Sequence, residues 1–176
     1  GLVSLDAPYV KTVLPLPDTT SASLTPEVIA KNNSDKPVTG ILRGNIGEIE
    51  FSKNVTLNAG EEKTISFDPK EYTQLNMSSP KLWWPNGYGA QPLYDVNFSV
   101  VCNGVRTQFP AFKFGVRTVE LNVSPLHDEG EERLFTWVVN GQPIFCKGGD
   151  WIPSDSIYAR VSDHKYEVLI REAIEA

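Results

Sequence analysis

Residues 93–102 alternate between apolar and polar side chains, and this pattern constrains the fold more than any other in the chain. The apolar positions are Tyr94, Val96, Phe98 and Val100. Because successive side chains of a strand point to opposite faces, the spacing predicts a strand with one buried face. Asn103 and Gly104 follow directly, and this pair favours the two-residue turn of a β-hairpin. The region is therefore expected to be antiparallel.

Further strand-like segments lie at short intervals with turn residues between them. The predicted strands are 7–16, 24–31, 36–44, 46–57 (one or two strands), 63–67, and a return strand over 105–123 that breaks near Pro110. The composition agrees, since 13 Gly and 13 Pro in 176 residues favour turns over long helices. About seven antiparallel strands in about 120 residues are typical of a sandwich. We therefore predict an all-β fold, an immunoglobulin-like antiparallel β-sandwich over 1–124, with a partly open barrel as the alternative.

The pattern changes after residue 124. Residues 125–133 are acidic and turn-like, which predicts a solvated linker. Two short strands are then expected over 134–139 and 143–147, joined through the turn residues Asn140 and Gly141.

A single amphipathic helix is predicted near the C-terminus. Ser162 is expected to cap it, and Asp163 suits the positive first turn. Its apolar stripe follows helical spacing at Tyr166, Leu169, Ile170, Ala173 and Ile174. Leaving that stripe unburied forfeits roughly 1.5–3 kcal/mol for each large apolar side chain, so we expect the helix to dock on the sandwich or on a second copy of the chain.

A strand, a loop and one helix are typical of the first unit of a repeating β/α domain. We therefore interpret 134–176 as the N-terminal fragment of a (β/α)₈ barrel, and expect the chain to be truncated. On this interpretation the later strands and helices of the barrel are missing.

Charge and hydropathy exclude two classes of partner. The net charge of −6 argues against nucleic acid, because phosphate contacts require clustered Lys and Arg. No apolar run approaches the roughly 18–20 residues of a membrane span. The N-terminal residues carry no signal architecture, so the localisation stays open, with a secreted or periplasmic longer protein as one option.

Several residue types with functional potential have a simpler interpretation. Cys102 and Cys146 lie in apolar contexts, which predicts two buried free thiols, with a disulfide between them as the alternative. His127 and His164 have no ligand-spaced partners, so no metal site is predicted. Asn-x-Ser/Thr triplets begin at Asn32, Asn54, Asn76, Asn97 and Asn122. Ser/Thr-rich strands produce such triplets by chance, and we favour that interpretation over glycosylation.

Three segments resemble one known family. Residues 82–94 (Leu-Trp-Trp-Pro-Asn-Gly-Tyr-Gly-Ala-Gln-Pro-Leu-Tyr) resemble the tryptophan-rich segment of the immunoglobulin-like domain of glycoside hydrolase family two, and residues 114–119 resemble the closing strand of that domain. Residues 139–155 resemble the entry into the family's (β/α)₈ barrel. Trp-Trp-Pro paired with Trp-Ile-Pro-Ser-Asp is similar to the β-mannosidase-like branch.

The resemblance implies a retaining exo-β-glycosidase that acts on terminal β-linked sugars and needs no cofactor. Retention requires two carboxyl groups roughly 5–5.5 Å apart. In the family both glutamates come from late barrel strands, so we expect no catalytic residue in this chain. Its role in the parent enzyme would be to scaffold the neighbouring domains. A stand-alone carbohydrate-binding or adhesion module is the alternative.

Asp150 and Trp151 are the candidate substrate-binding residues. Both are expected at the C-terminal end of the first barrel strand, where active sites of such barrels gather. The indole could stack on a sugar, and the carboxylate could accept hydrogen bonds from hydroxyl groups. Branch members usually show Ala-Asn or Ser-Asn where this chain has Gly149-Asp150, so mannoside, glucosaminide and galactoside all stay open.

Trp83 and Trp84 have two interpretations. They could form a sugar-binding platform, or they could pack at a domain interface or over the end of the sandwich. Adjacent residues of an extended segment face opposite ways, so packing is favoured.

Overall fold

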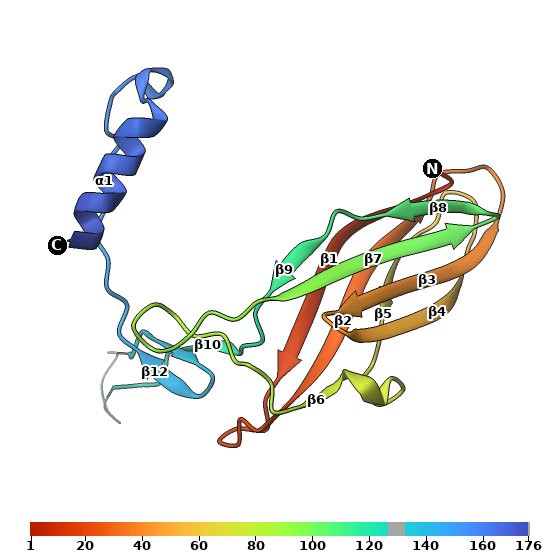
Figure 1. Cartoon of the computed structure of the whole chain (residues 1–176), viewed down its shortest axis with the longest axis horizontal. Helices are drawn as coiled ribbons and strands as arrows, with labels where there is room; N and C mark the ends of the chain where they lie inside the picture. The colour runs from red at the N-terminus through yellow and green to blue at the C-terminus, as the bar shows by residue number, and fades with distance from the viewer. Residues whose placement is uncertain (127–132, 176) are drawn as a thin grey trace. The chain divides into compact units, whose positions relative to one another are not determined.

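The computed structural model describes residues 1–126 and 133–175 (Figure 1). The chain forms two compact units, Gly1–Phe145 and Cys146–Ala176, and each is described by itself. The first unit holds every strand that the structure describes, and the second holds the long helix.

The first sheet of the larger unit is built on one long strand. β2 (Ser21–Asn32) pairs antiparallel with β1 (Val3–Val13) along one edge. β5 (Glu62–Ser66) and the short β6 (Asn76–Ser78) pair with its other edge. β1 is consequently an edge strand of this sheet.

The second sheet contains the alternating segment singled out in the sequence. Its order is β4 (Ile49–Leu57), β3 (Val38–Ile46), β7 (Tyr94–Cys102) and β8 (Val105–Gln108), and β9 (Phe112–Phe114) also pairs with β7. Asn103 and Gly104 both have positive φ angles, as the turn between β7 and β8 requires. The break near Pro110 separates β8 from β9 as predicted.

The core lies between these two sheets. Val96, Phe98 and Val100 are all within it, which confirms the predicted buried face of β7. Phe51 packs against Phe67 and Phe98, with ring centroids 4.6 and 5.9 Å away. An all-β fold with two packed antiparallel sheets is thus confirmed, with one C-terminal helix beyond it.

A third, small sheet continues the unit. β10 (Val119–Asn122) pairs with β11 (Thr136–Val139), which pairs with β12 (Gln142–Ile144). The hairpin predicted through Asn140-Gly141 is present, although its strands are shorter than expected. It pairs with the end of the return strand, a long-range partner that local periodicity does not indicate. The boundaries predicted at 124 and 134 stay a prediction; most of the linker lies outside the described residues.

The second unit contains the predicted helix, α1 (Asp163–Glu175), preceded by a short 3₁₀ turn, η2 (Tyr158–Arg160). Another 3₁₀ turn, η1 (Thr73–Leu75), lies in the larger unit. The Lys165 N–H donates to Ser162 Oγ at 3.3 Å, so the predicted cap is confirmed. Within the described residues of α1 no side chain is buried, and docking of its apolar stripe stays a prediction. None of the described helices is both long and apolar enough to span a membrane.

Two polar predictions can be compared with the structure. Cys102 and Cys146 are both free thiols, but only Cys102 is buried; the expected burial of Cys146 is wrong, because the chain leaves the sheet after Ile144. Asn32 is fully buried, and its Nδ2 donates to three backbone carbonyls. A glycan on that nitrogen would break these bonds, so the Asn32 triplet has a structural role.

Candidate functional site

Asn140 is the centre of a buried hydrogen-bonded junction in the larger unit. It lies at the tip of the β11–β12 hairpin with φ of 50° and is 2% exposed. Its Oδ1 accepts from the Thr118 N–H at 3.0 Å, and its Nδ2 donates to the Trp83 carbonyl at 3.0 Å. Its own N–H donates to the Thr118 carbonyl at 3.1 Å. One side chain therefore joins the hairpin to two segments that are distant in sequence.

The indole of Trp83 packs inside the same junction. The Arg117 guanidinium lies 4.3 Å from the centroid of its ring, within cation–π distance. A Cβ on Gly115 would come within 2.9 Å of Trp83 Cβ and Cγ, so only glycine lets the two segments approach this closely. The Trp83 N–H also donates to the Val116 carbonyl at 2.9 Å. These contacts favour packing over sugar binding for Trp83.

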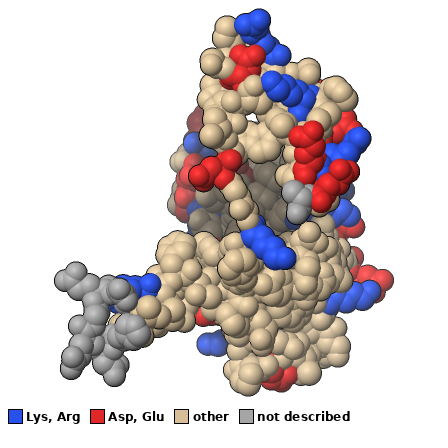
Figure 2. Space-filling view, turned by 90° about the vertical axis from the view of Figure 1, so that its left-hand side faces the viewer, with Lys and Arg blue, Asp and Glu red and all other residues tan. Residues whose placement is uncertain are grey.

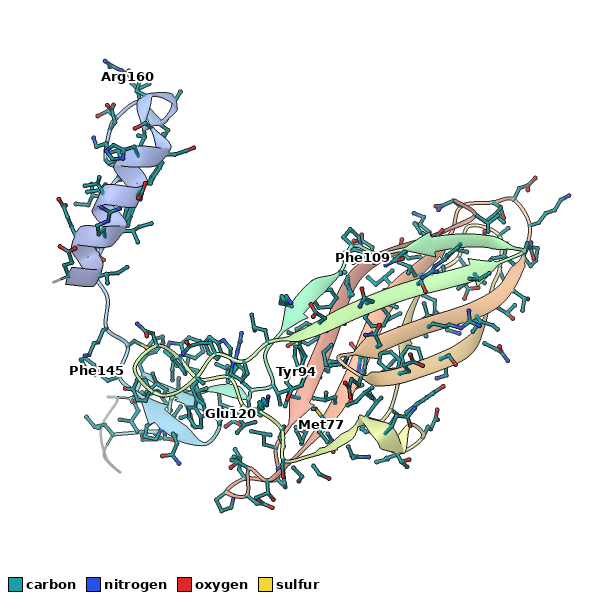
Figure 3. All side chains as sticks on the ribbon, in the orientation of Figure 1. Met77, Tyr94, Phe109, Glu120, Phe145 and Arg160 are labelled. Atoms are coloured by element: carbon teal, nitrogen blue, oxygen red, sulfur yellow. The ribbon has the colours of Figure 1, made fainter. Side chains whose placement is uncertain are left out.

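We call residues 82–91 the tryptophan loop. Trp84 is half-buried and packs against Gly89, and Gln91 Nε2 donates to the carbonyls of both residues. The Tyr88 hydroxyl accepts from the Phe145 N–H at 2.9 Å, where the chain leaves β12 (Phe145 is labelled in Figure 3). The loop thus contacts the β11–β12 hairpin at both its tip and its exit.

Asp150 and Trp151 lie in the second unit. The segment 146–153 forms no strand, so these residues do not follow the end of a regular strand. Both are exposed, and Trp151 retains 55% of its accessible surface. Their side chains are therefore accessible to a ligand.

Contacts with the first turn of α1 shape the segment around Trp151. The Trp151 ring stacks on the Tyr166 ring, with centroids 6.2 Å apart and an interplanar angle of 20°. Lys165 Nζ donates to the Ser154 carbonyl at 2.7 Å. Asp155 Oδ1 accepts from the Ile157 N–H at 2.8 Å, closing a local turn. The first turn of α1 therefore holds the loop at two points.

On the face shown in Figure 2, Lys and Arg side chains are interspersed with Asp and Glu and form no basic patch. No group of three or more His, Cys, Asp or Glu residues able to hold a metal occurs among residues 1–126 and 133–175. His127 lies outside the described residues, and His164 is on α1.

Comparison with known proteins identifies the family. A sequence model of glycosyl hydrolases family 2 matches residues 3–117. The exo-β-D-glucosaminidase of Streptomyces avermitilis is 35% identical over 155 residues, covering 88% of this chain and 16% of that protein. β-Mannosidase B of Aspergillus clavatus is 37% identical over 110 residues, covering 62% of this chain and 13% of that protein.

Solved structures agree with the sequence comparisons. The exo-chitosanase of Amycolatopsis orientalis superposes with a TM-score of 0.77 at 25% identity, over 99% of this chain and 19% of that one. The β-D-mannosidase of Dictyoglomus thermophilum shares the fold, with a TM-score of 0.68 at 23% identity over 97% of this chain and 20% of that one.

The fold and these matches define a β-sandwich of the glycoside hydrolases. The chain belongs to glycosyl hydrolase family 2. The resemblance noted in residues 82–155 is thereby confirmed, with relatives named as β-mannosidases and as an exo-β-glucosaminidase. The chain spans only about a sixth of the length of the first of these relatives.

Sequence reasoning missed the residues that organise the site. Asn140 was interpreted only as a turn residue, yet its side chain joins three segments. Arg117 and Tyr88 carried no local signal, because their partners lie elsewhere in the chain. Tyr166 was assigned to an apolar stripe, and its helical spacing could not reveal a stack on Trp151.

Proposed function

We propose that this chain is the non-catalytic sandwich region, with the start of the barrel, of a longer retaining exo-β-glycosidase acting on terminal β-linked sugars. The observation that carries the proposal is the match to an exo-β-D-glucosaminidase over 88% of this chain but 16% of that enzyme. On this proposal residues 134–176 begin the catalytic domain, and other domains of the longer protein are the chain's main partners.

The exposed acids of the β3–β4 region lack the apolar setting that glycosidase chemistry requires. A general acid needs a carboxyl group in an apolar setting that raises its pKa, with a second carboxylate at hand. The closely spaced acids Glu48, in the β3–β4 turn, and Glu50, in β4, are instead exposed. The proposal therefore assigns the cleaving carboxylates to a part of the longer protein outside this chain.

Asp150 and Trp151 are proposed to line the sugar pocket of the longer protein. The indole offers an apolar face, and the carboxylate offers two acceptor oxygens. A carboxylate also attracts the ammonium of a 2-amino sugar, whereas a neutral amide at this position would not. Asp150 thus favours a β-glucosaminide over a β-mannoside.

Activity assays test both the non-catalytic assignment of this chain and the proposed role of Asp150 in the longer protein. We expect the 176-residue chain to hydrolyse neither an aryl β-mannoside nor an aryl β-glucosaminide; turnover that persists after repeated purification contradicts the non-catalytic assignment. The longer protein should hydrolyse at least one of them. In it, Asp150→Asn should lower the preference for the glucosaminide, and an unchanged ratio contradicts the role of Asp150.

Exposed apolar side chains support a neighbouring domain. Tyr9, Val13 and Leu93 keep 59%, 61% and 51% of their surface accessible, beside the edge strand β1. They border one groove, which is also lined by residues 112–115 and 117–120. Apolar groups gathered along an edge strand are typical of a surface that another element covers.

One observation favours a carbohydrate-binding module as the second candidate. A groove on the β4–β3–β7–β8 sheet is lined almost entirely by hydrogen-bonding side chains, among them Arg43, Asn45, Asn97, Ser99 and Gln108. Such groups could bind sugar hydroxyls. Calorimetric titration of mannan or chitosan fragments tests it: saturable binding abolished by Asn97→Ala supports this candidate, and no binding leaves scaffolding as the function.

A further inference from the structure

Trp151 stacks on Tyr166 and still keeps more than half of its surface accessible. The two rings are nearly parallel, with centroids 6.2 Å apart, an offset arrangement favoured by aromatic quadrupoles. Tyr166 therefore covers part of one face of the indole. Since 55% of the Trp151 surface stays accessible, the residue keeps area that a ligand could contact.

The stack is part of a wider attachment of the loop to the helix. Ser162 caps α1 through the Lys165 N–H, which fixes where the first turn begins. The Lys165 side chain then holds the Ser154 carbonyl, three residues beyond Trp151. Successive residues of one helical turn thus contact the loop, one through a charged hydrogen bond and one through a ring.

We propose that Tyr166 is a positioning residue that holds the Trp151 indole in the orientation in which it stacks on the sugar. This inference rests on the proposed function, in which Trp151 lines the sugar pocket. Tyr166 itself does not touch the sugar. It restrains the indole before binding, so that less rotamer freedom is lost when the sugar arrives.

The proposal also predicts how the sugar lies. Because Tyr166 stacks on the indole, we expect a pyranose to stack on the indole face away from Tyr166, by its own apolar C–H face. A ligand without an apolar ring face should gain nothing from Tyr166.

The stack can be tested in the 176-residue chain by fluorine NMR with 5-fluorotryptophan. The Trp151 resonance is assigned by its loss in Trp151→Phe. We expect Tyr166→Ala to shift this resonance, since the ring current of Tyr166 is removed, and Tyr166→Phe to leave it nearly in place. A Trp151 resonance that does not respond to Tyr166→Ala overturns the proposal.

The functional role is tested by steady-state kinetics of the longer protein with an aryl β-glycoside. An aromatic pair of ordinary strength predicts that Tyr166→Ala raises KM by about 3- to 10-fold with kcat little changed. Tyr166→Phe should restore the original KM, because the ring and not the hydroxyl makes the stack. A purely structural loss at α1 would instead lower the amount of folded enzyme without changing KM.

Trp151→Ala separates failure of this inference from failure of the proposed function. If Trp151→Ala raises KM and Tyr166→Ala does not, Tyr166 has no positioning role, while sugar binding by Trp151 stands. If neither substitution changes KM, the sugar does not contact this loop, and both the inference and the proposed pocket are wrong.

Discussion

At the scale of single residues, Asn140 shows how much one side chain can organise. It adopts a left-handed backbone conformation that few residues other than Gly and Asn accept readily. It also satisfies the backbone groups of Thr118 and Trp83 in a buried setting. Backbone shape and hydrogen bonding therefore select the same amino acid.

Replacing Asn140 separates these two contributions. Asn140→Gly keeps the backbone conformation and loses only the side-chain bonds, which should lower the free energy of unfolding by about 1–3 kcal/mol. Asn140→Ala adds about 1–2 kcal/mol of left-handed strain. Urea denaturation of the unsubstituted chain and the two variants gives the order of their free energies of unfolding. Equal stability of the alanine and glycine variants would show that the turn conformation is not strained.

The two thiols should differ sharply in reactivity. Burial raises the pKa of Cys102 above its ordinary value of 9.0, whereas Cys146 is exposed. Because the thiolate is the reactive form, iodoacetamide at pH 8 should modify Cys146 in the native protein and Cys102 only after unfolding. Mass spectrometry gives the site, and Cys146→Ser is the control. Rapid native labelling of Cys146→Ser would contradict the burial of Cys102.

The raised pKa of Cys102 also links stability to pH. The folded state favours the protonated thiol of Cys102. The contribution of this thiol to the free energy of unfolding is therefore fully present below the ordinary pKa of 9.0 and is lost as the pH rises beyond that value. Between pH 8 and pH 10, the free energy of unfolding should therefore fall less for a Cys102→Ala variant than for the unsubstituted 176-residue chain.

At the scale of elements, the tryptophan loop stabilises the β11–β12 hairpin through hydrogen bonds at two points. It contacts the hairpin tip through the Trp83 carbonyl and the hairpin exit through the Tyr88 hydroxyl. The loop has little regular structure, so its conformation depends on these contacts and on its own Gln91 bonds. Trp83 packs on Gly115, and Trp84 packs on Gly89.

The hydroxyl of Tyr88 makes the most easily tested of these contacts. Tyr88→Phe removes the acceptor of the Phe145 N–H and should lower the free energy of unfolding by about 0.5–1.5 kcal/mol. Hydrogen exchange should quicken at Phe145 in particular. Tyr158→Phe is the matched control, since Tyr158 is 68% exposed. If the two variants exchange alike at Phe145, the hydroxyl contact does not hold the hairpin.

Local patterns predicted the elements far better than their partners. The alternation in 93–102 and the Asn103-Gly104 pair located β7 and its turn, because both depend on adjacent residues. Ser162 likewise located the start of α1. The pairing of β10 with β11 could not be predicted, since its nearest partners, Asn122 and Thr136, are fourteen positions apart in the sequence. Tyr166 was missed for the same reason: its partner is Trp151 on a loop, and periodicity describes only its own helix.

At the scale of the whole molecule, the groove beside β1 should matter only when its neighbour is present. Val13 is 61% exposed, so Val13→Lys should change the stability of the 176-residue chain by no more than about 0.5 kcal/mol. In the longer protein it should lower the melting temperature, because a charge would be buried against a packed domain. Val105→Lys, at a position 43% exposed at the start of β8, is the control. Equal effects of the two substitutions in the longer protein would mean that the groove is not an interdomain surface.

The Asn140 junction determines where the sandwich can be cut. A polypeptide that stops at Ser124 lacks β11 and β12, so the Thr118 N–H and the Trp83 carbonyl lose their buried partners. One that stops at Phe145 keeps them. We expect the polypeptide that ends at Phe145 to melt cooperatively. The one that ends at Ser124 should melt at a lower temperature and bind a hydrophobic dye. A version of this module that is transplanted into another enzyme should therefore include the β11–β12 hairpin, because Asn140 of that hairpin is the hydrogen-bond partner of Thr118 and Trp83.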